Sequence, residues 1–305
     1  IVHGGGRYES PQIITPAVLA VLEALVPLAP GHLPHEIGAV RAMMRRYPDT
    51  PHVACFDTAF HRHMPLRAQR YALPPALWER GIRRYGFHGL SYEYIVGELA
   101  AQHALGARTI VAHLGNGASM AAVHQGVSVD TTMGFTPTSG LVMSTRTGDL
   151  DPNVVLYLQR AEGWTLDAVD ELVNRQGGLL AVSGVSGDMQ DLLARERTDE
   201  RAAEAITLFC YRAQRAVGAL AAVLGGVDTL VFTAGIGEHA PAIRRRICDA
   251  LGFLGITLDP ARNAANAPII SRADAPVTVR VMRTDEERMI ARHTCRLLTA
   301  QRALA

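Results

Sequence analysis

An arginine that could face a transferring phosphoryl group stands in a run of small residues. Arg146 lies within Thr145–Pro152, which also carries Asp149 and Asp151. The planar fork of a guanidinium group matches the oxygens of phosphate and carboxylate groups. The run therefore predicts either an arginine presented to an anionic substrate or a surface loop in which Arg146 pairs with one of the two carboxylates.

Two glycine-containing segments could let the backbone approach a phosphate closely. His113–Ser119 has the pattern of a β-hairpin with a type I′ turn at Asn116 and Gly117. The same segment could surround phosphate oxygens with backbone N–H groups and with asparagine and histidine donors, and both interpretations can be true together. Val231–Glu238 is typical of a buried strand that delivers a glycine turn at a helix start, which suits a nucleotide.

Carboxylate and imidazole groups occur at three further positions. Asp57 ends an apolar strand, where site residues of α/β proteins are common, although it could instead cap the next segment. His88 is either a packed core histidine or, because glycines lie nearby on both sides, a residue at a close backbone approach. Thr284 and Glu287 have the spacing of a capping box, whereas a carboxylate of the same run could reach Mg²⁺.

The hydrophobic pattern predicts the elements that must position these groups. Helices are expected over residues 12–28, 74–80, 91–103, 153–160, 166–174, 200–224, 242–251 and 286–298, and strands over residues 52–56, 109–114, 119–124, 229–233 and 277–281. Thr15 and Ser91 are the expected N-caps of two helices, with Pro16 at a first helical position. The run Arg244–Arg246 is expected on a solvated helix face. Strands that alternate with helices favour an α/β fold.

The composition argues against several classes of protein. The 305 residues are 48% apolar and 19% charged, with a net charge of +1, so we expect neither nucleic acid nor a membrane as a partner. All 30 basic residues are arginines, which argues against a Walker A loop, a protein kinase and a Schiff-base enzyme, because each requires a lysine. Four widely spaced cysteines argue against a zinc site or a disulfide framework and fit a reducing cytoplasm.

Eight segments, in order and spread over essentially the whole chain, resemble the acetate kinase family. They are Val2–Gly5, Phe56–His61, Arg83–Gly89, His113–Ser119, Met133–Pro152, Ser183–Met189, Thr233–Glu238 and Thr284–Glu287. The segment HLGNGAS, at His113–Ser119, is close to a family signature. The resemblance implies an actin-like ATPase (ribonuclease H-like) α/β fold with a nucleotide cleft between two lobes. It also implies a reversible, direct in-line transfer from ATP to acetate, giving ADP and acetyl phosphate, with Mg²⁺.

The resemblance implies roles for individual residues. Arg146 would stabilise the transferring phosphoryl group, Asp57 would lie near the phosphate and the metal, and His88 would contact the transferred group. Glu286 would serve the metal. The implied nucleotide-binding residues are His113, Asn116, Gly117, Asp188, Met189, Gln190, Gly235, Ile236, Gly237 and Glu238. The implied acid pocket contains Val2, His32, Phe87 and Pro137.

The sequence departs from the family pattern at its start. The family opens with a strand, an Asn-x-Gly-Ser-Ser-Ser phosphate loop and an arginine just before the position that matches Ile1, and the sequence shows none of them. We therefore expect an incomplete first lobe, formed by residues 1–59 and 287–305, beside a second lobe of residues 60–286. We also expect the 305-residue polypeptide to be poorly active or inactive.

Smaller departures leave alternatives open. Gly31 stands where the family has an apolar wall residue, and one methylene is worth only about 1–3 kcal/mol of discrimination, so propionate or butyrate is an alternative acid. Ser139, Gln190 and His239 also differ from the usual residues, which leaves the nucleotide preference open. A non-catalytic nucleotide-binding protein is the alternative outside enzymes. A homodimer is implied by family analogy.

Overall fold

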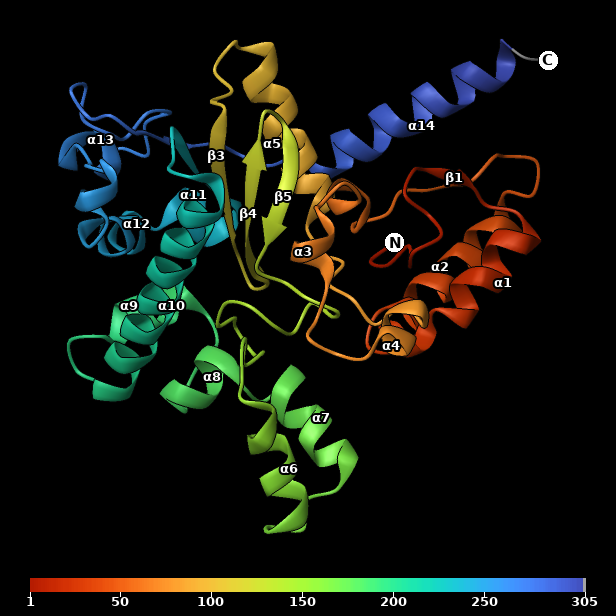
Figure 1. Cartoon of the computed structure of the whole chain (residues 1–305), viewed down its shortest axis with the longest axis horizontal. Helices are drawn as coiled ribbons and strands as arrows, with labels where there is room; N and C mark the ends of the chain where they lie inside the picture. The colour runs from red at the N-terminus through yellow and green to blue at the C-terminus, as the bar shows by residue number, and fades with distance from the viewer. Residues whose placement is uncertain (304–305) are drawn as a thin grey trace.

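A five-stranded mixed sheet forms the centre of the molecule (Figure 1). The computed structural model describes residues 1–303, without the side chain of residue 302. The strands, in the spatial order β5-β4-β3-β6-β7, are β5 (Val127–Thr131), β4 (Ala118–His124), β3 (Arg108–Leu114), β6 (Thr229–Thr233) and β7 (Thr278–Val281). β3 pairs antiparallel with β4 and parallel with β6. This pairing sets His113 beside both Ser119 and Thr233, so the segments that follow β3 and β6 start at the same edge of the sheet.

Helices cover both faces of this sheet. Ile110 and Ala112 of β3 belong to the apolar cluster around α10 (Glu200–Leu224), whereas Val111 belongs to the cluster around α5 (Gly89–Ala101). Alternate side chains of one strand therefore face opposite helix layers, as the pleat of a strand requires. Met289 of α14 (Glu286–Arg302) joins the α5 cluster, so the last helix packs on α5.

The first 60 residues build a smaller unit with its own core. β1 (Gln12–Ile13) pairs antiparallel with β2 (Val53–Ala54). Leu22, Leu33 and Phe56 are buried together there. The helices of this unit and of the segment that follows are α1 (Pro16–Ala24), η1 (Val26–Leu28), α2 (Leu33–Arg46), η2 (Ala59–His61), α3 (Leu66–Gln69) and α4 (Pro75–Glu79).

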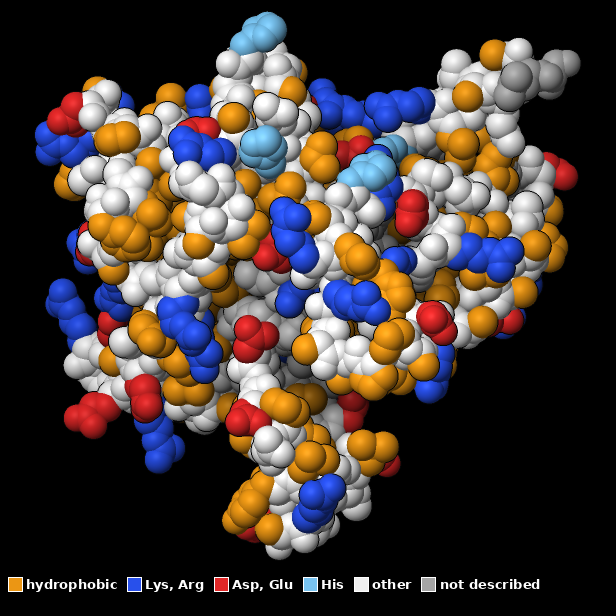
Figure 2. Space-filling model, in the orientation of Figure 1, with side chains coloured by type: hydrophobic (Ala, Val, Ile, Leu, Met, Phe, Trp, Pro, Cys, Tyr) orange, Lys and Arg blue, Asp and Glu red, His pale blue; other side chains and the backbone are white. Residues whose placement is uncertain are grey.

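The remaining helices lie to the left of and below the strands labelled β3, β4 and β5 in Figure 1. They are α6 (Pro152–Arg160), α7 (Leu166–Asn174), α8 (Gly178–Ser183), α9 (Met189–Arg195), α11 (Ala234–His239), α12 (Pro241–Asp249), η3 (Gly252–Leu254) and α13 (Pro260–Ala264). The α6–α7 pair projects from the body and exposes apolar side chains, among them Tyr157 and Leu166 (Figure 2). Within residues 1–303, no helix combines the length and the hydropathy needed to cross a membrane.

The predicted elements are largely confirmed, with corrections at their ends. α10, α7 and β6 have the predicted bounds, and Thr15 caps α1 as expected. Residues 12–13 are a strand, however, and the first helix begins only at Pro16. α2, with 14 residues, was not predicted, and neither were the shorter β5, α3, α8, α9, α11 and α13. The division into lobes at residues 59 and 286 stays a prediction, and its residues 304–305 lie outside the described part.

Three local predictions, of two helix caps and one turn, are wrong. α5 begins at Gly89 with His88 as its N-cap, so Ser91 is not a cap. Asp285, and not Thr284, caps α14 by accepting from Arg288 N. The β3–β4 hairpin exists, but neither residue of its Asn-Gly pair has a positive φ, so the turn is not type I′.

The environment predicted for Arg244 from the sequence is also wrong. Its side chain is fully buried, whereas its neighbour Arg245 is exposed. Arg246 is half-buried and pairs with Glu196, 2.6 Å away. The predicted solvated face therefore holds for the middle residue of this run only.

Candidate active site

Two stacked histidines lie where β3 and β4 meet the start of α5. The ring centroids of His88 and His113 are 4.1 Å apart, with planes inclined by 16°. Nδ1 of His88 lies 2.8 Å from Ser119 Oγ, and Nδ1 of His113 lies 2.8 Å from Ser91 Oγ. Hydroxyl groups therefore occupy one nitrogen of each ring, which orients the rings and leaves each Nε2 for another partner.

Asp57 sets the backbone turn that carries His88. One carboxylate oxygen of Asp57 accepts from His88 N at 2.7 Å, and the other accepts from Leu90 N at 3.4 Å. His88 has a φ of 57°, in the left-handed region, and this acceptor stabilises it there. A Cβ at Gly89 would stand 2.1 Å from Asp57 O, so this close approach requires glycine. The close-approach interpretation of His88 is confirmed. Asp57 caps the start of α5 and not the segment that follows it in the chain, because η2 has no side-chain cap.

Arg146 reaches the same region from the loop between β5 and α6. Its Nη1 donates to Pro137 O at 3.0 Å. A Cβ added to Gly117 would lie 3.2 Å from His88 Nε2 and 3.6 Å from Arg146 Nη1, so the histidine, the glycine and the arginine converge. Because Gly117 has no side chain, the space between His88 Nε2 and Arg146 Nη1 stays open.

The predicted pairing of Arg146 with a nearby aspartate is wrong. Asp149 accepts from Gly140 N, and Asp151 accepts from Asn153 N as the cap of α6. No carboxylate of residues 1–303 forms an ion pair with Arg146. A half-buried cation without a carboxylate partner is available to an anionic ligand.

Burial decides the protonation of the site. It lowers the pKa of His88 to about 3, helped by the positive charges of Arg146 and His61. Burial also lowers the pKa of His113 well below its usual value, and the neighbouring His88 adds to this. Both histidines are therefore neutral near pH 7, so the positive charge of the site comes from Arg146.

Two carboxylates of the site, Glu286 and Asp57, interact electrostatically. Glu286 is the first residue of α14, and burial, followed by the negative charge of Asp57, raises the pKa of Glu286 to about 7. Residues 1–303 contain no cluster of three or more metal-type side chains. Mg²⁺ is usually bound by one or two carboxylates together with water and substrate phosphates, so this pair fits that ion without a closed protein site.

A cavity of about 640 Å³ adjoins the β3–β4 loop. It is lined by Gly115, Asn116, Asp188, Met189, Gln190, Leu193, Gly235, Ile236, His239, Ala240, Pro241 and Ala242. Six of the ten predicted nucleotide-binding residues are in this lining, and they come from three distant segments. A volume in this range is typical of small-molecule sites.

The other four predicted nucleotide-binding residues lie behind or beside the cavity. His113 bonds Ser91, and Gly117 faces His88 and Arg146. Gly237 is buried against the end of β6, and the carboxylate of Glu238 accepts backbone N–H groups. These four residues are not part of the lining.

Two of the predicted acid-pocket residues, His32 and Pro137, lie near Arg146. Burial lowers the pKa of His32, and the charge of Arg146 adds to this, which places the imidazole near the guanidinium. The carbonyl of Pro137 accepts from Arg146. Val2 packs against the apolar cluster that contains the fully buried Phe87. Val2 and Phe87 thus share one apolar core, and their place in an acid pocket stays a prediction.

The sequence did not indicate the hydroxyl groups that support the histidines. Ser119 contacts both His88 and Tyr92 OH, and Ser91 contacts both His113 and Thr284. Ser119 belongs to the motif His113–Ser119, which was a usable signal. Tyr92 and Ser91 carried no sequence signal for this role, because their partners lie on other strands and helices.

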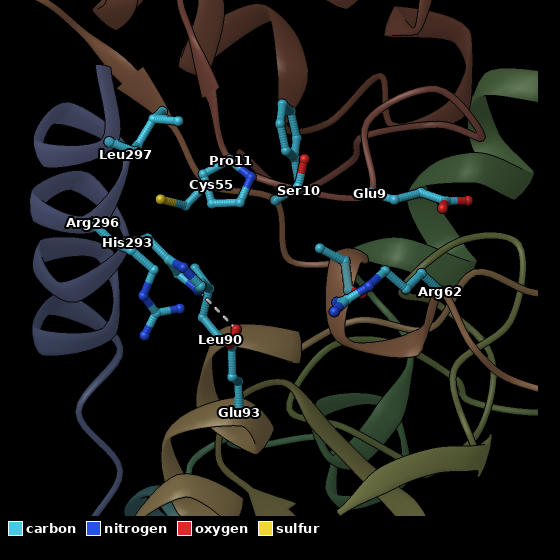
Figure 3. Close-up of a pocket in the computed structure, with 13 residues that line it drawn as sticks. Glu9, Ser10, Pro11, Cys55, Arg62, Leu90, Glu93, His293, Arg296 and Leu297 are labelled. Carbon is cyan, nitrogen blue, oxygen red and sulfur yellow. Dashed lines mark hydrogen bonds and ion pairs between the residues drawn. The ribbon is translucent and has the colours of Figure 1, made fainter. Parts of the chain in front are cut away.

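A second cavity, of about 370 Å³, lies between β2, α5 and α14 (Figure 3). Cys55, Leu90 and His293 are among its lining residues, and an ion pair of 2.8 Å between His293 and Glu93 joins α14 to α5. None of the predicted site residues lines it. It is therefore separate from the site described above.

Comparison with known proteins agrees with this arrangement. A family model described as the acetokinase family matches residues 1–292. The chain is 52% identical to a protein from Rhodopseudomonas palustris named acetate kinase, over 97% of this chain and 75% of that protein.

Two solved structures are also similar over most of the chain. Porphyromonas gingivalis acetate kinase superposes with a TM-score of 0.90 at 42% identity, covering 98% of this chain and 77% of the other. A propionate kinase from Francisella tularensis superposes with a TM-score of 0.92 at 38% identity, covering 96% and 77%.

Proposed function

The chain belongs to the acetokinase family, and we propose that it catalyses reversible phosphoryl transfer from ATP to acetate, giving ADP and acetyl phosphate. Its fold is the α/β fold of the acetate and propionate kinases, which belongs to the actin-like ATPases, as the resemblance implied. The observation that carries the proposal is the convergence of His88, Gly117 and the unpaired Arg146 beside a nucleotide-sized cavity.

The chemistry needs positioning and charge neutralisation. A carboxylate oxygen of acetate bonds to the γ-phosphorus while the bond from that phosphorus to the bridging oxygen of ADP breaks, and no proton has to be removed from the nucleophile. The loose transition state spreads negative charge over the equatorial oxygens of the transferred group. Arg146 supplies the matching positive charge, and the neutral imidazole of His88 can donate from Nε2.

Magnesium belongs to the same proposal. Asp57 and Glu286 would hold the ion, because the negative charge of Asp57 acts on the largely buried carboxyl group of Glu286. When bound, Mg²⁺ supplies charge neutralisation for the nucleotide phosphates. The two carboxylates, in turn, are relieved of their mutual repulsion.

The acid is a short-chain carboxylate, and acetate is the first candidate. The carboxylate would face Arg146 and His32, and its methyl group would face Val2, Phe87 and Pro137. Propionate is the second candidate, supported by the similarity to the Francisella tularensis propionate kinase. A cytoplasmic location and a homodimer remain proposals. The four cysteines without disulfide partners support the first of them.

A cavity-filling variant tests the nucleotide site. A Cβ at Gly235 meets no atom within 4 Å and Gly235 lines the 640 Å³ cavity, so Gly235→Phe fills the cavity without displacing the core. We expect at least a tenfold loss of ADP affinity by isothermal titration calorimetry, about 1.4 kcal/mol or more. Gly97→Phe is the matched control, because Gly97 is exposed on α5 and has equal room.

The same samples distinguish the alternatives. Binding is the first readout, and a hydroxamate assay with acetate, propionate and butyrate is the second. Unchanged ADP binding by Gly235→Phe would contradict the assigned cavity. Nucleotide binding without transfer to any of the three acids would favour a non-catalytic nucleotide-binding protein.

A further inference from the structure

Glu238 is a largely buried carboxylate that joins two segments of the site. Its Oε1 accepts from Ala234 N at 2.9 Å and from Thr284 N at 3.2 Å. Its side chain is only 12% exposed, and it does not line the nucleotide cavity. The carboxylate therefore ties the start of α11 to the turn that precedes α14.

The first of these contacts stabilises a strained turn. Ala234 has a φ of 64°, a left-handed conformation that costs a non-glycine residue of order 1 kcal/mol or more. This residue connects β6 directly to α11, whose next residues, Gly235 and Ile236, line the cavity. The acceptor on Glu238 thus supports the backbone of the cavity wall.

The second contact holds the turn that carries Glu286. Thr284 N donates to Glu238, and Thr284 Oγ1 donates to Ser91 Oγ at 2.8 Å. Asp285 then caps α14, and Glu286 is its first residue. Two anchors from different sides, Glu238 and Ser91, therefore fix the position from which Glu286 points.

The backbone of Glu238 is itself immobilised from behind. The buried Arg244 donates through Nη1 to Gly237 O at 2.8 Å and to Glu238 O at 3.0 Å. Because these two hydrogen bonds restrain the backbone, the length of the Glu238 side chain determines the position of Thr284 N.

We propose that Glu238 is a positioning residue for Glu286, acting as a hydrogen-bond acceptor for Thr284 N and not by contact with nucleotide or metal. The proposal rests on the proposed function, in which Glu286 serves Mg²⁺. It predicts that the acceptor atom and its reach matter, while the negative charge of Glu238 does not.

Three substitutions separate these properties. Glu238→Gln keeps the acceptor oxygen and the side-chain length but removes the charge. Glu238→Asp keeps the charge but shortens the side chain by one methylene. Glu238→Ala removes the acceptor oxygen and the charge. Glu287→Ala is the matched control, because Glu287 is an exposed carboxylate one residue beyond Glu286.

The first measurement is ADP affinity with Mg²⁺ and with EDTA, by calorimetry. We expect Glu238→Ala and Glu238→Asp to weaken binding about tenfold with Mg²⁺ and less than threefold with EDTA. Glu238→Gln and Glu287→Ala should stay within twofold of the parent in both buffers. If Glu238→Ala does not fold, the comparison of Gln with Asp carries the same information.

The second measurement needs no ligand. Hydrogen exchange by mass spectrometry should show faster exchange over residues 284–288 in Glu238→Ala and Glu238→Asp, and parental exchange in Glu238→Gln. If the parent protein binds no ADP, the proposed function is wrong. The exchange measurement would still test whether Glu238 holds the turn at residue 284.

Three results would overturn the inference. A Gln variant as weak as the Ala variant would show that the charge matters. Equal losses with Mg²⁺ and with EDTA would assign Glu238 to the cavity wall alone. Parental exchange over residues 284–288 in the Ala variant would show that Glu238 does not anchor the turn.

Discussion

Replacing the buried Arg244 with methionine should destabilise the protein by about 4 kcal/mol. The guanidinium donates to five acceptors. They are the backbone oxygens of Gly237, Glu238 and Asn263, the side-chain Oδ1 of Asn263, and Asn266 Oδ1 at 2.5 Å. Methionine keeps the apolar stem but removes all five hydrogen bonds, although Asn263 O retains the Asn266 N–H as a second donor. At about 1.5 kcal/mol for each, the loss is roughly 7 kcal/mol.

Part of that loss is offset. Burial lowers the pKa of Arg244 to about 10 from 12.5, so burying the charge costs roughly 3 kcal/mol, and methionine removes this cost. The difference of about 4 kcal/mol lies within the range measured when one partner of a buried charged network is removed. For a chain of 305 residues it corresponds to a fall in Tm of about 6 °C.

Urea unfolding followed by circular dichroism measures the free energy, and Arg245→Met supplies the control. Arg245 is the next residue of α12 and is exposed, so its replacement should change the free energy of unfolding by less than about 0.5 kcal/mol. A loss of less than about 1 kcal/mol for Arg244→Met would refute the reasoning, because the five hydrogen bonds would then contribute nothing beyond the cost of burying the cation.

Two further predictions concern the site and its pH dependence. Arg146→Ala should lower phosphoryl-transfer turnover in the hydroxamate assay by roughly 10²–10³-fold, while ADP affinity stays within about threefold. Arg175→Ala, which replaces an exposed arginine, should match the parent. A folded Arg146→Ala protein with parental turnover would contradict the assigned role. Burial lowers the pKa of His61 to about 4 from 6.5, so the unfolded state binds a proton that the folded state refuses, and stability should fall as the pH falls from about 6.5 to 4. His61→Gln should reduce the slope of the unfolding free energy against pH by up to about 1.4 kcal/mol per pH unit in that window, and an unchanged slope would count against the reasoning.

Much of the fold follows from local pattern. The period of α10 and the apolar run of β6 predicted the bounds that the structure shows, because each element buries residues at a spacing that its own backbone imposes. The ordered motifs also predicted the residues that line the cavity at Asn116 and Gly235. Chemistry carried by contiguous residues was therefore readable without coordinates.

Partnerships between distant residues were not readable. Asp57 supplies the acceptor at the start of α5, so Ser91 is free to bond His113, and Asp285 takes the capping position expected for Thr284. Arg244 is buried because carbonyls from α11 and amides near α13 surround it. A local pattern contains no information about such partners.

The sequence by itself determined which side chains could bind phosphate and which segments would be helix or strand, since these depend on residue type and on spacing within one element. Only the tertiary structure decided that Arg146 has no carboxylate partner within residues 1–303, that His88 and His113 stack, and that burial, followed by the charge of Asp57, raises the pKa of Glu286. Charge and hydrogen bonding act over a few ångströms in space, and residues far apart in the chain reach that range only after the sheet has assembled.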